Sequence, residues 1–189
     1  MVNEKIQILQ LLIENQENNL SIRQISRLRK INYKTAYNAV YTLKKEGIID
    51  MVKFGNSISC KFNLRFNESV FLAESKRRND LLKNKNIKII HKDISQLPFS
   101  FIALLFGSYV KQKQGKHSDI DIMVIGGEHD KIKSKFSLYP NKIHLTLLEY
   151  SDFLSMAKSK EFSVVSEVIK KNIILIGIED YYRLLENAG

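Results

Sequence analysis

The sequence is poor in several residue types whose absence limits what the protein can be. Cys60 is the only cysteine, which excludes an intrachain disulfide and a cysteine-rich metal site. Apolar runs are short, and none approaches the length that crosses a bilayer. The first residues, MVNEKIQ, lack the long apolar segment of a signal peptide. We therefore expect a cytoplasmic protein without membrane association.

Acidic residues are also scarce relative to basic ones, and unevenly so. The 189 residues hold 30 Lys and Arg against 20 Asp and Glu, a net charge of +10. Residues 1–66 hold 11 basic and 5 acidic residues, whereas residues 100–189 hold 12 and 11. This excess of positive charge indicates a polyanionic partner that contacts the N-terminal part of the chain.

The first third of the chain carries a pattern of helices followed by strands. Hydrophobic spacing predicts helices at 4–15, 21–29 and 33–46, and strands at 48–54 and 57–64. Ser21 and Asn32 each precede a helical pattern and are typical N-cap residues. The two strands meet at Gly55-Asn56, which predicts a hairpin.

This order is similar to that of winged helix-turn-helix domains. The segment LSIRQISRLRKINYKTAYNAVYTLKKEGII carries the resemblance, which covers about residues 3–64. It implies a homodimer on double-stranded DNA, with the third helix in the major groove. The implied DNA-binding residues are Tyr33, Lys34, Thr35, Tyr37, Asn38, Lys44, Lys45, Lys53 and Lys61. A protein-interaction or dimerisation module with a solvated basic face is the alternative.

The centre of the chain is the segment FIALLFGSYVKQKQGKHSDIDIMVIGG at 101–127. Its first six residues are apolar and stop at Gly107, which predicts a buried strand. In 118–125, Ile120, Ile122 and Val124 alternate with Asp119 and Asp121. Since alternate side chains of a strand share a face, the two carboxylates point the same way and can share one cation.

These residue types suit phosphoryl or nucleotidyl transfer. Carboxylates bind hard divalent ions such as Mg²⁺, which takes further ligands from substrate phosphates. Gly107 lets backbone approach a phosphate closely, and the Ser108 hydroxyl can bind its oxygens. Lys111 and Lys116 add positive charge nearby. Ordinary acids on a solvated strand edge are the alternative for Asp119 and Asp121, and a helix N-cap the alternative for Ser108.

Gly107-Ser108, ten intervening residues, then Asp119-Ile120-Asp121 resembles the signature of the DNA polymerase beta nucleotidyltransferase superfamily. The resemblance covers about residues 86–149 and is closest to the minimal nucleotidyltransferases. It implies ATP or another NTP as substrate and Mg²⁺ as cofactor, bound by Asp119 and Asp121. The implied nucleotide-binding residues are Gly107, Ser108, Lys111 and Lys116. Gln112 departs from the pattern, since the family usually has glycine there.

His144 marks a second departure from that family. It lies in the apolar run KIHLTLL at 142–148, where the family normally carries a third carboxylate. A neutral imidazole can accept a proton near pH 7, so His144 is a candidate catalytic residue with Asp119 and Asp121. Catalysis with a substituted base and nucleotide binding without catalysis both remain open.

The remaining segments complete an expected α/β (α+β) protein. A winged helix-turn-helix at 1–66 is followed by a connecting helix at 67–85 and a small mixed-sheet nucleotidyltransferase-like domain at 86–189. We expect the basic run at 76–78 to be a solvated face. Further elements are a helix ending by Pro98, a loop with or without a short helix at 126–141, helices at 151–158, 161–171 and 179–186, and a strand at 173–176. Phe162 is expected to point inward.

Three functions follow from these resemblances. The first is Mg²⁺-dependent transfer of a nucleoside monophosphate to a hydroxyl of a protein or RNA. Minimal nucleotidyltransferases of this kind often act as antitoxins that modify a partner toxin of the HEPN type, which makes such a toxin a candidate substrate. The second is a winged-helix transcriptional regulator whose degenerate nucleotidyltransferase domain senses nucleotide. The third is a nucleic-acid-modifying enzyme whose winged domain holds its substrate.

Overall fold

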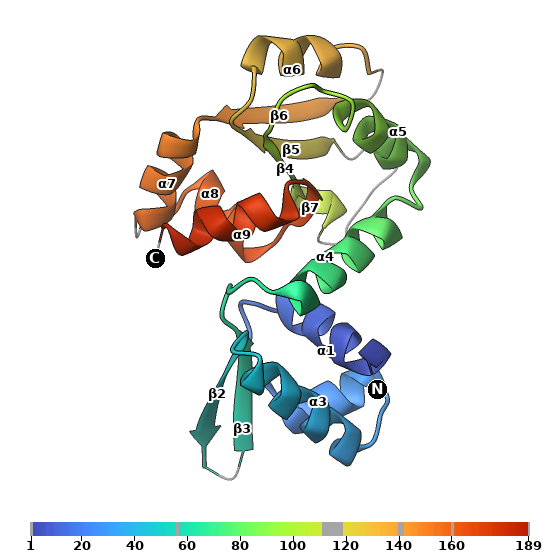
Figure 1. Ribbon diagram of the computed structural model, residues 1–189, viewed down its shortest axis with the longest axis vertical. Coiled ribbons are helices and arrows are strands. Elements are labelled where there is room, and N and C mark those ends of the chain that lie inside the picture. The colour runs from blue at the N-terminus through green and yellow to red at the C-terminus, as the bar shows by residue number, and fades with distance from the viewer. Residues whose placement is uncertain (1, 56, 111–118, 140–141, 160, 189) are drawn as a thin grey trace. The chain divides into compact units, whose positions relative to one another are not determined.

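The computed structural model describes residues 2–55, 57–110, 119–139, 142–159 and 161–188 (Figure 1). The chain divides into two compact units, Met1–Glu74 and Ser75–Gly189, here called the N-terminal and C-terminal units. The division falls within α4 (Glu68–Leu81), inside the segment for which the sequence predicts a connecting helix. Among the helices of the described residues, none is both long and apolar enough to span a bilayer.

Before α4, the described residues of the N-terminal unit form three helices and a small antiparallel sheet (Figure 1). Its elements are α1 (Val2–Glu14), β1 (Leu20–Ser21), α2 (Ile22–Arg29), α3 (Tyr33–Lys45), β2 (Ile49–Phe54) and β3 (Ser57–Phe62). The sheet has the order β1-β3-β2. The predicted helices and hairpin are confirmed to within a few residues. The two-residue β1 is too short to leave a periodic signal in the sequence.

Side-chain caps fix where the helices of this unit begin. The Ser21 hydroxyl accepts a hydrogen bond from the Gln24 amide at 3.2 Å, and the Ser21 amide donates to the Gln24 side chain at 2.8 Å. Asn32 starts α3 in a similar way, accepting from the Thr35 amide at 2.8 Å. Such caps satisfy amides that the helix leaves without partners. Both predicted N-caps are therefore confirmed.

The C-terminal unit is built on one four-stranded sheet. Its strands are β4 (Ile102–Phe106), β5 (Ile120–Ile125), β6 (Ile143–Leu148) and β7 (Ile173–Ile176), in the order β6-β5-β4-β7. Strands β5 and β6 are parallel, and β4 is antiparallel to both β5 and β7. The predicted mixed sheet is confirmed. Its helices are α5 (Lys85–Ile94), α6 (His129–Phe136), α7 (Tyr150–Lys158), α8 (Val164–Lys170) and α9 (Ile178–Glu186).

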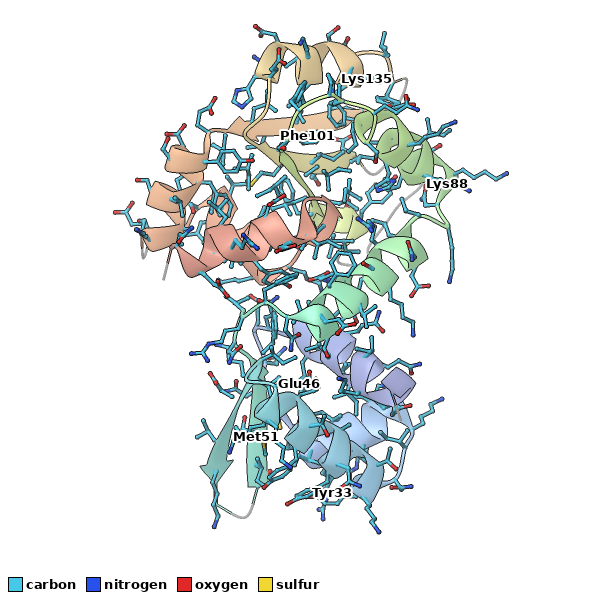
Figure 2. The ribbon with its side chains drawn as sticks, viewed as in Figure 1. Tyr33, Glu46, Met51, Lys88, Phe101 and Lys135 are labelled. Atoms are coloured by element: carbon cyan, nitrogen blue, oxygen red, sulfur yellow. The ribbon has the colours of Figure 1, made fainter. Side chains whose placement is uncertain are left out.

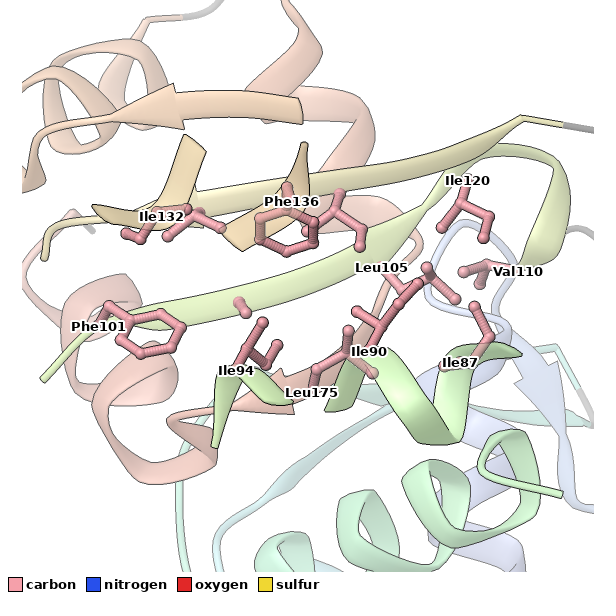
Figure 3. Close-up of a cluster of buried hydrophobic side chains, with 13 residues drawn as sticks. Ile87, Ile90, Ile94, Phe101, Leu105, Val110, Ile120, Ile132, Phe136 and Leu175 are labelled. Atoms are coloured by element: carbon pink, nitrogen blue, oxygen red, sulfur yellow. The ribbon is translucent and has the colours of Figure 1, made fainter. Parts of the chain in front are cut away.

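A continuous apolar core joins α5 and α6 to one face of this sheet (Figure 3). Both helices contribute residues spaced three or four apart, and the strands contribute alternate residues, as expected for one buried face of each. The contacting side chains are Ile87, Ile90 and Ile94 of α5, Ile132 and Phe136 of α6, and Ala103, Leu105, Ile120, Ile122, Val124 and Leu175 of the strands. This core fixes β5, and with it the direction in which Asp121 points.

Two expectations for the surface of this unit are wrong. Arg77, expected on a solvated face, is 5% exposed and donates to the Asn172 carbonyl at 2.7 Å. Arg78 donates to the Leu175 carbonyl at 3.2 Å, so backbone oxygens beside and within β7 stabilise both guanidinium groups. Phe162, expected to point inward, is 80% exposed because α8 begins only at Val164.

Candidate functional site

Three predicted side chains meet where β5 and β6 begin. The strands run parallel with Asp121 opposite His144, so the carboxylate and the imidazole leave neighbouring backbones on the same side. His144 Nδ1 lies 3.4 Å from Asp121 Oδ1, and His144 Nε2 lies 3.4 Å from Asp119 Oδ2. Each ring nitrogen therefore faces one carboxylate. All three side chains remain accessible, with 31%, 24% and 53% exposure for Asp119, Asp121 and His144.

Lys142 joins this group, and the sequence analysis did not identify it. Its Nζ lies 3.1 Å from Asp119 Oδ2, on the same oxygen that faces His144. The Ile120 amide donates to the Lys142 carbonyl at 3.0 Å, which holds the two backbones together at this point. Lys142 precedes His144 by two residues and so shares its strand face. That spacing was the available signal, but it becomes meaningful only once β6 is known to pair with β5.

Gly107 places the turn after β4 against the Asp121 carboxylate. Phe106 pairs with Asp121 across β4 and β5, and the chain then enters the short 3₁₀ helix Gly107–Tyr109. Gly107 has φ +71°, and a Cβ there would lie 2.0 Å from Asp121 Oδ2. Only glycine allows both this backbone conformation and this approach. Ser108, which follows in the turn, is half-buried.

The donor set of this site suits a hard divalent cation in part. Asp119 and Asp121 offer carboxylate oxygens on one side of a strand, which fits an ion that takes its other ligands from water and substrate phosphates. The third neighbour, His144, offers nitrogen. No group of three His, Cys, Asp or Glu side chains with metal-binding spacing occurs in the described ranges. The two aspartates are therefore the residues that would hold such an ion.

Two predicted nucleotide-binding residues, Lys111 and Lys116, lie outside the described residues.

The predicted DNA-binding residues gather on α3 and the β2–β3 hairpin of the N-terminal unit. Most of the α3 set is exposed, whereas Thr35 is half-buried. Tyr33, labelled in Figure 2, begins a row of tyrosines along α3. Ring centroids are 6.3 Å apart for Tyr33 and Tyr37, and 4.3 Å apart for Tyr37 and Tyr41. Sequence reasoning missed Tyr41, although its i+4 spacing was visible. The exposed members are Tyr33, Lys34, Tyr37, Asn38, Lys44 and Lys45 on α3, and Lys53 and Lys61 on the hairpin.

Comparison with models of known protein families gives a match in the C-terminal unit. A family model described as "Polymerase beta, Nucleotidyltransferase" matches residues 84–181. The matched range contains Gly107, Asp119, Asp121 and His144 together with the whole four-stranded sheet. No curated protein and no solved structure matches the chain.

Proposed function

Because the chain belongs to the polymerase beta nucleotidyltransferase family, we propose that it transfers a nucleoside monophosphate from ATP or another NTP to a hydroxyl group. The acceptor is a protein, in the manner of an antitoxin acting on a HEPN-type toxin, or an RNA. The observation that carries this proposal is the meeting of Asp119, Asp121 and His144 beside the Gly107 turn.

The geometry supports a division of roles in this reaction. The acceptor hydroxyl attacks the α-phosphorus, a new P–O bond forms, and pyrophosphate leaves. Mg²⁺ bound to Asp119 and Asp121 would supply positive charge to the phosphate oxygens. The Gly107-Ser108 turn lies against Asp121, where its backbone and hydroxyl would bind the triphosphate. We assign further phosphate contacts to Lys111 and Lys116.

His144 would accept the proton of the attacking hydroxyl. One imidazole nitrogen faces each aspartate, and the ring is about half exposed, so an acceptor can reach it. A neutral imidazole performs general base chemistry near neutral pH. The same observation, a histidine between the two aspartates, favours a second function.

In this second function, the nitrogen that replaces a third carboxylate oxygen leaves a site that would bind nucleotide without turnover. The protein would then be a nucleotide-sensing transcriptional regulator.

We further propose that the N-terminal unit is a winged helix-turn-helix that binds double-stranded DNA as a homodimer. Supporting this are the element order α1-β1-α2-α3-β2-β3, the capped α3 and the exposed Lys34, Asn38 and Lys45 along it. Lysines would bind phosphates and Asn38 would read base edges. The net charge of +6 over residues 1–66 favours a polyanion over a neutral protein surface.

The central experiment is a transfer assay with each labelled NTP, Mg²⁺, and either the product of the adjacent gene or total RNA. Wild type should label one acceptor, Asp119→Asn should not, and Asp130→Asn, which changes an exposed acid on α6, should label normally. Labelling by Asp119→Asn would reject the metal assignment. Nucleotide binding without labelling of any acceptor would favour the regulator.

Electrophoretic mobility shifts with promoter DNA test the second proposal. Binding should weaken steeply as salt rises, because phosphate contacts release counterions. Absent or salt-insensitive binding would refute DNA recognition by this unit.

A further inference from the structure

Asp119 has an ammonium group and an imidazole beside one of its carboxylate oxygens. Its Oδ2 atom lies 3.1 Å from Lys142 Nζ and 3.4 Å from His144 Nε2. Two carboxylates held close together repel each other, and a nearby cation relieves that repulsion. The ammonium group of Lys142 therefore neutralises part of the negative charge of the two aspartates, as a bound divalent ion would.

We propose that Lys142 is a resident counter-ion of Asp119 which a divalent cation displaces, and that the displaced ammonium group then binds a phosphate of the nucleotide. This inference rests on the proposed function, and it adds a phosphate-binding residue that also sets the affinity of the site for metal.

The surroundings of Lys142 allow its ammonium group to lie either beside Asp119 or beside a phosphate of the nucleotide. The backbone is fixed, since the Lys142 carbonyl accepts from the Ile120 amide at 3.0 Å. The side chain is 69% exposed, so its four-carbon stem can move without breaking a packed core. A triphosphate that shares a cation with Asp119 must lie within a few ångströms of that carboxylate. The ammonium group would then exchange one anionic partner for another at short range.

Lys142 forms its ion pair with Asp119. The ammonium group pairs with Asp119, whereas Asp121 is faced by His144 and by the Gly107 turn. Within the described residues, a metal that binds at the site thus competes with Lys142 at Asp119. Loss of the lysine charge should make metal binding easier and nucleotide binding harder, two effects of opposite sign that a merely structural residue would not produce.

The test measures Mn²⁺ binding by electron paramagnetic resonance, without nucleotide, for wild type, Lys142→Met, Lys142→Arg and Asp119→Asn. Lys133→Met, an exposed lysine on α6, is the matched control. Calorimetry with α,β-methylene-ATP at saturating Mn²⁺ gives the second readout. We expect Lys142→Met to bind Mn²⁺ about threefold more tightly, as for loss of an exposed ion pair, and the analogue about tenfold more weakly. Lys142→Arg should stay close to wild type for the analogue, and Lys133→Met should match wild type in both.

Lys142→Met equal to wild type in both measurements, or weaker in Mn²⁺ binding, would overturn the proposal. Tighter Mn²⁺ binding with unchanged analogue binding would refute the phosphate contact. If Lys142→Met binds Mn²⁺ and wild type does not, the result would support a metal site that Lys142 blocks. If neither wild type nor Lys142→Met binds Mn²⁺, both the metal assignment and the lysine proposal would be overturned. Asp119→Asn separates the two failures. If it binds Mn²⁺ as wild type does, the metal assignment of the proposed function fails. If it loses Mn²⁺ while Lys142→Met equals wild type, only the lysine proposal fails.

Discussion

The two units of the chain arrange their charged side chains in opposite ways. On α3 of the N-terminal unit the lysines are exposed and spread along the helix, and the Arg29–Glu4 ion pair lies between other helices. In the C-terminal unit, His144 lies 3.4 Å from both Asp119 and Asp121, and Lys142 lies 3.1 Å from Asp119. Spread charge of one sign attracts a long polyanion, whereas mixed charge at one point suits chemistry on a single bond. The comparison teaches that residue placement, more than net charge, separates the two expected activities.

The largest expected effect comes from Asp121→Asn. It removes a charge that the proposed mechanism needs in the transition state, and we expect nucleotidyl transfer to fall by about a hundredfold or more. DNA affinity, measured by fluorescence anisotropy, should stay unchanged, because residue 121 belongs to the other unit. A parallel loss of DNA affinity would mean that the two activities are not separable in this way.

The converse experiment changes Lys34 and Lys45 together to Ala. If each binds one phosphate, the slope of log affinity against log salt should shrink by about 2, with affinity lower by about tenfold at moderate salt. Transfer activity should not change. The matched control replaces two exposed lysines of the C-terminal unit, Lys133 and Lys170. A similar loss in that control would show that total charge, rather than α3, determines binding.

Gly107 and Gly55, which both have positive φ, allow the stability of the two units to be compared. Gly107→Ala strains the backbone and drives a Cβ against Asp121 Oδ2, so we expect a loss of about 3 kcal/mol in the free energy of unfolding. Gly55→Ala in the hairpin has φ +56° and no atom within 4 Å of a Cβ, and should lose only about 1 kcal/mol. Urea denaturation of both variants measures the difference. Equal losses would remove the evidence for a tight approach at Gly107.

The smallest expected effect is a loss of folding stability at acid pH. Burial and the positive charge of Arg78 lower the pKa of His91 below 6.5, outweighing a hydrogen bond with the Leu175 backbone. The folded C-terminal unit therefore binds that proton less well than the unfolded chain, and loses stability as pH falls below 6.5. Melting temperatures between pH 7.5 and 5 should fall less for His91→Gln than for wild type.

The N-terminal unit should respond only at lower pH. Burial raises the pKa of Glu46, but hydrogen bonds from Lys5 and Ser69 outweigh burial and hold it below 4.5. The stabilisation is complete above pH 4.5 and is lost as pH falls through the folded-state pKa. Glu46→Gln should flatten the melting profile only in that acid range. A slope that Glu46→Gln removes near pH 6 would contradict this assignment.

Sequence patterns predicted most elements because each leaves a local signal. Asn32 and its amphipathic helix, or Asp119 and Asp121 on one strand face, depend on spacing alone. Contacts between side chains of different strands were harder to predict from the sequence. Lys142 became visible only with the β5–β6 register, and the approach of Gly107 to Asp121 needed the β4–β5 pairing. The buried Arg77 was missed because a basic run gives no sign of the carbonyls that will accept its hydrogen bonds.

The position of β6 in the sheet has a consequence for how this site can change. Among the strands of the described residues, β6 is outermost and pairs with β5, and His144 projects from it half exposed. Asp121 instead leaves an interior strand whose alternate residues are fully buried. Substitutions at residue 144 should therefore disturb folding little, whereas substitutions of the buried residues of β5, such as Ile122 and Val124, should cost stability. Position 144 is therefore a place in this site where a different side chain would cost the fold little stability.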